Sequence, residues 1–242
     1  MERATADVVA ALESADLESP SLLPHWSRLS IACHLRYGAE ALQWMTRDTI
    51  AGRPTSYYPD GRATQRPTTL VPRDDESSAD VVTSLRQEST ALHDRWRTVN
   101  DWSIRIVEPP DNADLGPVPL SRLALARLTE VEVHGTDLDL GLGPWSEVLV
   151  RHVLPMRLEW LNARRSNHRE VDTTIRSSWR LVATDMELSH VVAVDGDNVI
   201  SQPGATADTT IIGTGAELSS LLLGRAPTGF APEDFSRALP GP

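Results

Sequence analysis

The spacing of apolar residues changes once along this chain of 242 residues, and this change constrains the fold more than any other feature. Up to about residue 167, apolar side chains recur every three or four positions, as they do on one face of an α-helix. Beyond this point the chain has short runs with β-branched residues, such as SWRLVAT and HVVAV, divided by Gly, Asp, Asn and Pro. We therefore predict an α+β protein with a helical bundle over residues 1–167 and a small α/β domain over residues 168–242.

Four to five helices are expected in the first region and one in the second. Side-chain oxygens that can accept from free backbone amides mark two of the starts: Ser27 for the second helix, and Ser77 or Ser78 for the third. Pro155 lies inside the fifth range, but we expect the helix to continue despite it. The expected ranges are residues 4–14, 28–50, 79–99, 120–139 and 146–162 in the first region, and 216–223 in the second.

The segment 52–78 separates the second and third of these helices and contains four prolines. Proline lacks a backbone N–H and clashes inside a helix, so we predict a long loop here. Loops of this length are uncommon in compact domains unless they shape a site. Its side chains Tyr57, Tyr58, Arg62 and Arg66 are therefore candidates for covering a substrate.

Charge and composition exclude several classes of function. A formal net charge of −11 opposes approach to a phosphate backbone, so we predict that the protein binds no nucleic acid. No apolar run reaches the roughly 18 residues of a membrane-spanning helix, and residues 1–14 lack the pattern of a secretory signal. We expect a cytoplasmic protein, monomeric or homodimeric, that acts on small molecules.

Glu130 and His134 lie four residues apart in a predicted helix, which places their side chains on one face. One cation can bridge them, because zinc binds imidazole nitrogen and carboxylate oxygen at about 2.0–2.2 Å. A catalytic zinc site usually has three protein ligands, and His34 on the other well-capped helix is the third candidate. Two simpler interpretations stay open: Glu130 and His134 can form a surface pair, and His34 can be a hydrogen-bonded core residue.

Asp137 and Cys33 lie close in sequence to the candidate ligands, and each could affect the site. Asp137 follows His134 by three residues and can either orient its imidazole through a hydrogen bond or lie at the surface as a helix-end acid. Cys33, the single cysteine, points about 100° away from His34 around the helix. We predict that Cys33 is a small buried hydrophobe and forms no intramolecular disulfide.

Three segments have the order and spacing of motifs from a known family: LLPHWSRLSIACHL at 22–35, RLTEVEVHGTDL at 127–138 and LLLGR at 221–225. In these motifs the sequence resembles the mycothiol-dependent maleylpyruvate isomerases, which belong to the wider DinB-like metalloenzymes. In that family the first motif carries a metal-binding histidine, which His34 matches. The second supplies a glutamate and a histidine four residues apart, which Glu130 and His134 match.

The resemblance implies a DinB-like bundle that binds a divalent metal, with zinc the first choice, and a small α/β domain that closes over the active site. It also implies mycothiol, the low-molecular-weight thiol of actinobacteria, as cosubstrate. Arg225 matches an arginine that faces the active site; we expect it to hold a carboxylate or an enolate of the substrate, with help from Arg62. All 23 basic residues are arginine, which fits a GC-rich actinobacterial genome.

The implied chemistry is an isomerisation. A metal-activated thiolate adds to the double bond of a substrate such as maleylpyruvate, the resulting single bond rotates, and elimination gives the trans isomer. Two alternatives stay open: a mycothiol S-transferase of detoxification or natural-product biosynthesis, and a protein that binds metal or thiol without turnover. Thr129 stands where some relatives have arginine, and residues 57–66 match the family loosely, so the natural electrophile is not determined.

Overall fold

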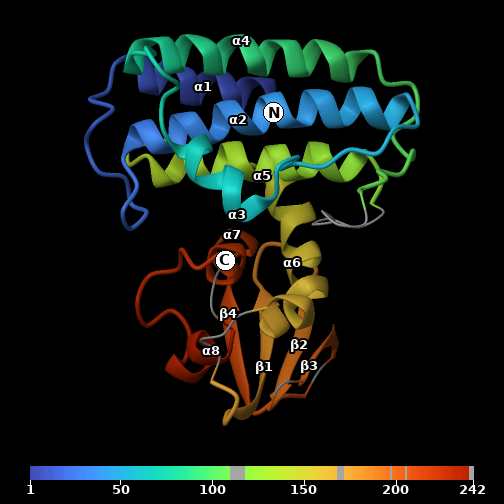
Figure 1. The fold of residues 1–242 in the computed structure, drawn as a ribbon. Helices are drawn as coiled ribbons and strands as arrows, with labels where there is room; N and C mark the ends of the chain where they lie inside the picture. The colour runs from blue at the N-terminus through green and yellow to red at the C-terminus, as the bar shows by residue number, and fades with distance from the viewer. Residues whose placement is uncertain (110–117, 168–171, 197, 205, 240–242) are drawn as a thin grey trace. The chain divides into compact units, whose positions relative to one another are not determined.

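The computed structural model divides the chain into two compact units, residues 1–144 and residues 145–242. Each unit buries apolar side chains of its own. Figure 1 shows the course of the chain from the N-terminal helices to the C-terminal sheet. The structure describes all residues except 110–117, 168–171, 197, 205 and 240–242.

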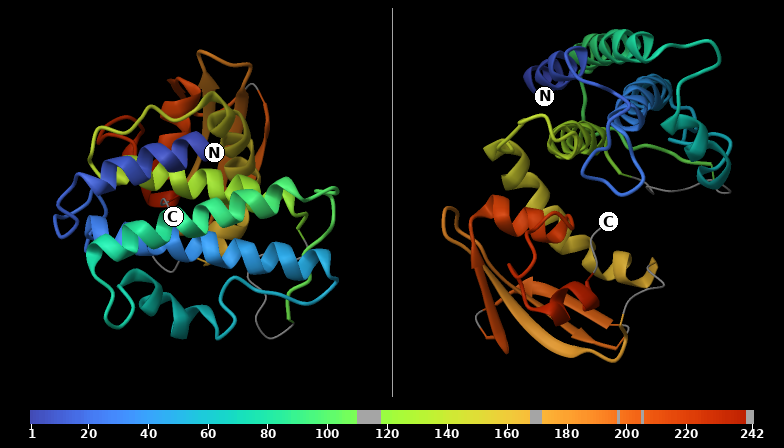
Figure 2. Two further views of the ribbon diagram at one scale, coloured as in Figure 1. Left: turned by 90° about the horizontal axis from the view of Figure 1, so that it is seen from above. Right: turned by 90° about the vertical axis from the view of Figure 1, so that its left-hand side faces the viewer.

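Four long helices run alongside one another in the described part of the first unit (Figures 1 and 2). Helices α1 and α2 each contact both α4 and α5, so the four form a bundle. No helix described is both long and apolar enough to cross a lipid bilayer. The bounds agree with the predicted ranges to within two residues; they are α1 Glu2–Glu13, α2 Arg28–Ile50, α4 Ser78–Arg97 and α5 Ser121–Asp137.

The helix starts follow from local sequence. The Ser27 side chain accepts a hydrogen bond from the backbone N–H of Ser30 and caps α2, as predicted. Of the two serines proposed for α4, Ser77 is the cap, and it forms a reciprocal capping box with Asp80. Each such cap satisfies backbone donors that the helix itself leaves free, which stabilises the helix by about 1 kcal/mol.

The segment between α2 and α4 differs from its prediction. It was expected to be a loop throughout, but it forms two short helices, α3 (Arg62–Gln65) and the 3-10 helix η1 (Arg66–Leu70). Pro67 lies in the first turn of η1, where a backbone N–H has no partner within the helix, so proline is tolerated there. The prolines limit the length of these helices without preventing them.

The second unit is a four-stranded sheet covered by helices, which confirms the predicted α+β class. The strand order is β3-β2-β1-β4, with β1 antiparallel to β2 and parallel to β4. The described helices of the unit are α6, α7 and α8. The bounds are α6 Glu147–Asn167, β1 Arg176–Ala183, β2 Ser189–Asp195, β3 Asn198–Pro203, β4 Thr209–Gly213, α7 Gly215–Leu222 and α8 Glu233–Ala238.

One face of this sheet forms the core of the second unit. Trp179 and Leu181 alternate along β1 and are buried, as expected for a strand with one covered face. Leu154 of α6, Leu218 of α7 and Phe235 of α8 belong to the same cluster. Helix α8, with six residues, was not predicted, because so short a stretch shows no helical period.

Helix α6 is grouped with the sheet and not with the bundle. The sequence placed the domain boundary near residue 167, after this helix, whereas the compact units divide between Pro144 and Trp145. The reason is that the apolar face of α6, including Leu154 and Leu158, belongs to the core of the sheet. Helical spacing identifies which side chains are buried, but it does not identify the partner against which they pack.

Candidate functional site

Two histidines from distant parts of the chain meet inside the first unit. His34 lies in α2 and His134 in α5, and their ring centroids are 5.1 Å apart with the ring planes at 82°. Two imidazoles bound to one tetrahedral zinc ion, with Zn–N bonds of about 2.0–2.1 Å, would have centroids roughly 5 Å apart. The separation of the two rings therefore suits a shared cation.

His34 has the surroundings of an uncharged imidazole. It is 6% exposed, and its Nδ1 atom is buried without a hydrogen-bond partner in the described part of the chain. Burial, followed by the charges of His134, Arg66, Arg127 and Arg62, holds the pKa of His34 well below its usual value. A neutral ring with a free lone pair is the form that binds a metal ion.

His134 is oriented by a carboxylate. Its Nδ1 atom lies 2.9 Å from Oδ2 of Asp137, which is itself buried. Of the two roles considered for Asp137, the structure therefore supports the hydrogen-bond partner. A proton on Nδ1 directs the Nε2 lone pair away from the carboxylate, which is how second partners fix the tautomer of a metal-binding histidine.

An indole ring forms the wall beside both imidazoles. Trp26, one residue before the cap of α2, lies edge-on to His34 at 5.5 Å and stacks on His134 at 6.0 Å between centroids. The guanidinium of Arg66 lies over the Trp26 ring, 5.7 Å from its centroid.

Glu130, the third predicted ligand, is engaged by two donors. The Tyr57 hydroxyl donates to Oε1 at 3.1 Å, and Nη1 of Arg127 donates to Oε2 at 3.4 Å. Arg127 is fully buried, and its role was missed in the sequence analysis. The signal that could have revealed it is its position three residues before Glu130, on the same face of α5.

The predicted metal site is thus matched in part by the geometry. The two imidazoles suit one cation, and a carboxylate that accepts two hydrogen bonds still has lone pairs for a third partner. Among the residues that the structure describes, however, no group of three His, Cys, Asp or Glu side chains is arranged so that it could hold a metal ion. The assignment of His34, Glu130 and His134 as a complete ligand set stays a prediction.

The segment from 55 to 66 brings aromatic and cationic side chains to the site. Tyr58 is buried, and the guanidinium of Arg62 lies 5.5 Å from its ring centroid. Nη1 of Arg66 donates to the Tyr58 hydroxyl at 3.3 Å. Because Arg62 and Arg66 both lower the pKa of His34, their positive charges act on the site. This arrangement favours an anionic ligand.

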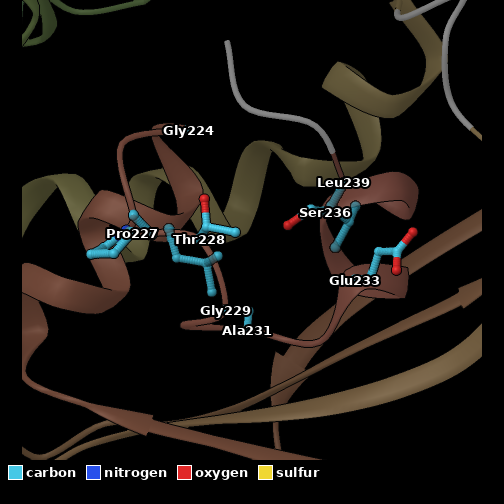
Figure 3. Close-up of a pocket in the computed structure, with 10 residues that line it drawn as sticks. Gly224, Pro227, Thr228, Gly229, Ala231, Glu233, Ser236 and Leu239 are labelled. Atoms are coloured by element: carbon cyan, nitrogen blue, oxygen red, sulfur yellow. The ribbon is translucent and has the colours of Figure 1, made fainter. Parts of the chain in front are cut away.

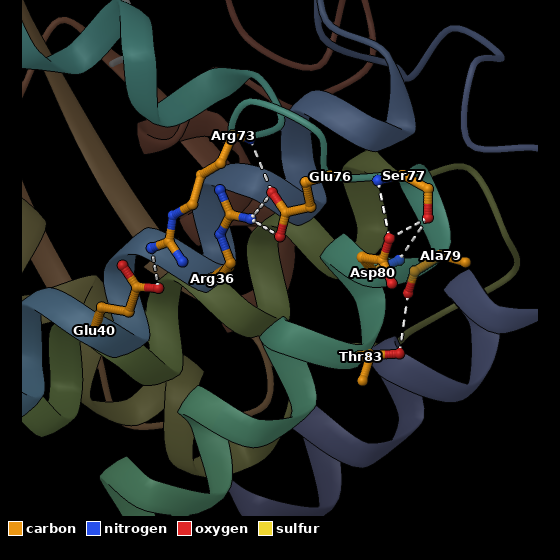
Figure 4. A network of polar contacts seen from close by, with 8 residues as sticks. All are labelled: Arg36, Glu40, Arg73, Glu76, Ser77, Ala79, Asp80 and Thr83. Atoms are coloured by element: carbon orange, nitrogen blue, oxygen red, sulfur yellow. Dashed lines mark hydrogen bonds and ion pairs between the residues drawn. The ribbon is translucent and has the colours of Figure 1, made fainter.

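A buried ion pair fixes the chain between η1 and α4 (Figure 4). Arg36 of α2 has only 3% of its side chain exposed, and it donates to both carboxylate oxygens of Glu76. The backbone N–H of Arg73 donates to Glu76 at 2.9 Å, and the Arg73 side chain pairs with Glu40. The sequence analysis did not consider this network. It anchors the segment between α2 and α4 (residues 51–77), called the covering segment from here on, to the same helix that carries His34.

The same helix carries the single cysteine, Cys33, which is fully buried as predicted. Burial raises the pKa of its thiol to about 11, with a smaller opposing effect of Arg36. A thiol in this state is neither a ready nucleophile nor a ready metal ligand. The structure therefore assigns Cys33 to the core.

Arg225, predicted to bind the substrate, belongs to the second unit. It lies three residues after the end of α7, is half-buried, and donates from Nη1 to the carbonyl of Leu223 at 2.6 Å. Close to it in sequence is a pocket of about 600 Å³ (Figure 3). Glu233 is the one ionisable side chain among the described residues that line the pocket, and a carboxylate does not favour an anionic ligand. Other lining residues are Gly224, Pro227, Thr228, Gly229 and Ser236.

The sequence matches the model of one protein family. Residues 1–139 match the family described as the mycothiol maleylpyruvate isomerase N-terminal domain. No curated protein matches the sequence. The crystal structure of the mycothiol-dependent maleylpyruvate isomerase is similar, with a TM-score of 0.68 and 18% identity over 94% of this chain and 87% of the other. A histidine-to-alanine mutant of that isomerase has the same score and identity, over 96% and 91%. Likeness at this identity establishes the fold.

Proposed function

The chain belongs to the family of the mycothiol maleylpyruvate isomerase N-terminal domain, as its motifs predicted, and on this premise we propose that it is a metal-dependent, mycothiol-using enzyme. The observation that carries the proposal is the pair of imidazoles, His34 and His134, whose centroids are 5.1 Å apart. His34 is buried, which lowers the pKa of its imidazole and so favours the neutral form that binds a metal ion. Asp137 lies within hydrogen-bond distance of His134 and can orient its ring. Glu130 is the proposed third ligand.

The proposed reaction is an isomerisation without a redox cofactor. A divalent ion, with zinc the first choice, would supply the charge that makes a thiolate the favoured form of the cosubstrate near neutral pH. The thiolate adds to one carbon of a cis double bond, and the electron pair moves onto the conjugated carbonyl as an enolate. The former double bond rotates, the enolate expels the thiolate, and the trans double bond forms. Thiol and electron count are unchanged.

The remaining roles fall to side chains around the imidazoles. Trp26 offers an apolar wall that limits access of water to the reacting carbons. Arg62 is proposed to stabilise a carboxylate or the developing enolate, and its electrostatic effect on His34 supports this role. Arg225 is proposed for the same task because it matches the arginine of the family's third motif. These are the proposed catalytic groups.

Metal analysis tests the first part of the proposal. Purified protein should contain about one divalent ion per chain, and His34→Ala or His134→Ala should lose most of it while keeping the helical circular dichroism signal. His93→Ala is the matched control, since His93 is also a buried histidine of the bundle. Full metal content in either ligand variant would refute the assignment. Arg225→Ala should retain the metal and weaken substrate or thiol binding.

An assay with mycothiol and maleylpyruvate tests the second part. An isomerase leaves both the substrate mass and the thiol concentration unchanged, whereas an S-transferase consumes thiol and gives an adduct. An intact metal site with no reaction of any electrophile would instead indicate a binding protein. Cytoplasmic location, an actinobacterial source, and the monomeric or homodimeric state stay predictions from the sequence.

A further inference from the structure

Two arginines of the covering segment have no carboxylate partner. Neither Arg62 of α3 nor Arg66 of η1 forms an ion pair with an acidic side chain in the described part of the chain. Most arginines described in the first unit do form one, as Arg36 does with Glu76. Acidic residues outnumber basic ones by 34 to 23, so carboxylates are in excess. The two guanidinium groups therefore keep their charge for an anion from outside the chain.

Aromatic side chains fix the position of Arg66. Its guanidinium carbon lies over the Trp26 ring, 5.7 Å from the centroid, and its Nη1 donates to the Tyr58 hydroxyl at 3.3 Å. Tyr58 is 1% exposed and stacks on Tyr37 with the ring centroids 5.5 Å apart. A cation–π contact and a hydrogen bond restrict a side chain that would otherwise sample many rotamers. Arg66 is therefore held in place before any ligand binds.

The contact with Trp26 brings the Arg66 guanidinium close to the two imidazoles. The same indole lies edge-on to His34 at 5.5 Å and stacks on His134 at 6.0 Å between centroids. Arg66 and both imidazoles thus share one aromatic neighbour. A small molecule bound to Arg66 at one end can therefore extend toward the imidazoles with its other end.

Arg66 retains the donors that recognise a carboxylate. A guanidinium has five N–H groups, and among the described residues only the Tyr58 hydroxyl accepts from that of Arg66. Two parallel N–H groups match the two oxygens of a carboxylate. Arg62 adds a second positive charge, 5.5 Å from the centroid of the same Tyr58 ring. Because Arg62 is exposed and Arg66 is half-buried, solvent screens the charge of Arg62 more strongly.

We propose that Arg66 binds the carboxylate of a small acidic substrate beside the two imidazoles, and that Trp26 and Tyr58 position its guanidinium for this contact. The inference rests on the proposed function and deepens it, since it names the substrate class of the same site. Arg62 becomes the secondary cation of this carboxylate site. No metal ion takes part in the contact, so the carboxylate binds with or without one.

Titration calorimetry with maleate, a small cis-dicarboxylate, tests the proposal. Arg66→Gln should weaken maleate binding about 10- to 100-fold, because it removes a charge-assisted pair of hydrogen bonds. Arg62→Gln should weaken it about two- to fivefold. Arg95→Gln is the matched control: it removes the same charge from an exposed arginine of α4 that has no carboxylate partner in the described chain. This control should bind maleate within about twofold of wild type.

Two further variants and one ligand separate geometry from charge. Arg66→Lys keeps the charge but loses the planar pair of donors, and it should weaken maleate binding at least about fivefold. Tyr58→Phe keeps the ring and removes the hydroxyl that accepts from Arg66, and it should weaken binding about threefold. The diamide of maleate has the same shape without negative charge and should not bind detectably. Urea denaturation of each variant verifies that the fold is retained.

Binding is measured on the protein as purified and again after metal is removed with a chelator, so that a carboxylate held by a metal ion is not mistaken for one held by Arg66. The inference is overturned if wild type binds no maleate, if Arg66→Gln or Arg66→Lys binds it as tightly as wild type, or if Arg95→Gln loses as much affinity as Arg66→Gln. Isomerase activity of the same wild-type protein would then leave the proposed function standing. Maleate binding that depends on Arg66, in a protein without metal or activity, would instead overturn the proposed function and leave the carboxylate site.

Discussion

The two units of this protein bury different kinds of side chain. Nearly all of the buried polar and charged residues that the structure describes lie in the helical unit, among them His34, Arg36 and Arg127. Among the described residues of the second unit there is one, Ser219, beside a core of aliphatic and aromatic side chains around Trp179. Helices and strands both form apolar cores, so this difference does not come from the type of secondary structure.

The contrast shows that the helical unit contains buried polar groups whose loss of hydration opposes folding. A buried guanidinium such as Arg127 loses its hydration, and its hydrogen bonds and ion pair recover this loss only when they are all made. The described part of the second unit buries no comparable charged side chain. Polar groups that are buried and mutually fixed are common at functional sites, which agrees with placing the chemistry in the helical unit.

The strongest test of this contrast is the removal of a buried charge. Arg127→Met should lower the free energy of unfolding by about 3–5 kcal/mol, because it leaves Glu130 partly buried without its counter-charge and Ser89 without its donor. Urea denaturation measures the change. Arg176→Met in the second unit is the control; Arg176 pairs with Asp195 at the surface, and its loss should cost less than about 1 kcal/mol.

A cavity in the apolar cores should affect both units alike. Leu181→Ala in the sheet and Leu85→Ala in the bundle each remove a side chain that is at most 1% exposed, so each should cost about 3 kcal/mol. Leu181→Ala should leave the zinc stoichiometry unchanged at temperatures where the protein stays folded. A loss of metal in that variant would contradict the assignment of the chemistry to the first unit.

Loss of the buried ion pair between Arg36 and Glu76 should lower the free energy of unfolding by less than the changes above. Glu76→Gln leaves Arg36 buried without a full counter-charge and should cost about 1–3 kcal/mol. Amide exchange should accelerate at residues 73–77, which this pair anchors. Glu147→Gln, which breaks an exposed pair with Arg151 in the second unit, should change stability by less than about 1 kcal/mol. Equal costs for the two variants would remove the distinction between the units.

The smallest expected effect is a dependence of stability on pH. Burial holds the pKa of His93 below its usual value, so near pH 6 the unfolded chain binds more protons than the folded one. Stability is then complete above about pH 6.5 and falls as the pH is lowered. His93→Gln should make the fall in melting temperature of the metal-free protein shallower. His152→Gln, at an exposed position of the second unit, should leave the profile unchanged.

Much of the local structure could be predicted. The period of apolar residues gave the long helices, and Ser27 and Ser77 marked two of their starts. Both signals depend on residues within a few positions of one another, which is why the sequence reveals them. The short helices α3 and η1 were missed, because one or two turns contain too few residues to show a period. The boundary predicted near residue 167 follows α6, whereas the two compact units divide before this helix, and the packing partners of α6 are far away in sequence.

The sequence by itself determined the helices, the change to a sheet, the family, and the pair Glu130 and His134 on one face of a helix. Only the tertiary structure decided that His34 meets His134, that Asp137 is buried against it, and that Arg127 and Tyr57 reach Glu130 above Gly38. The physical reason is range. Helical period and capping act within one or two turns, whereas contacts between α2, α5 and the covering segment depend on how the helices pack, which no local pattern specifies.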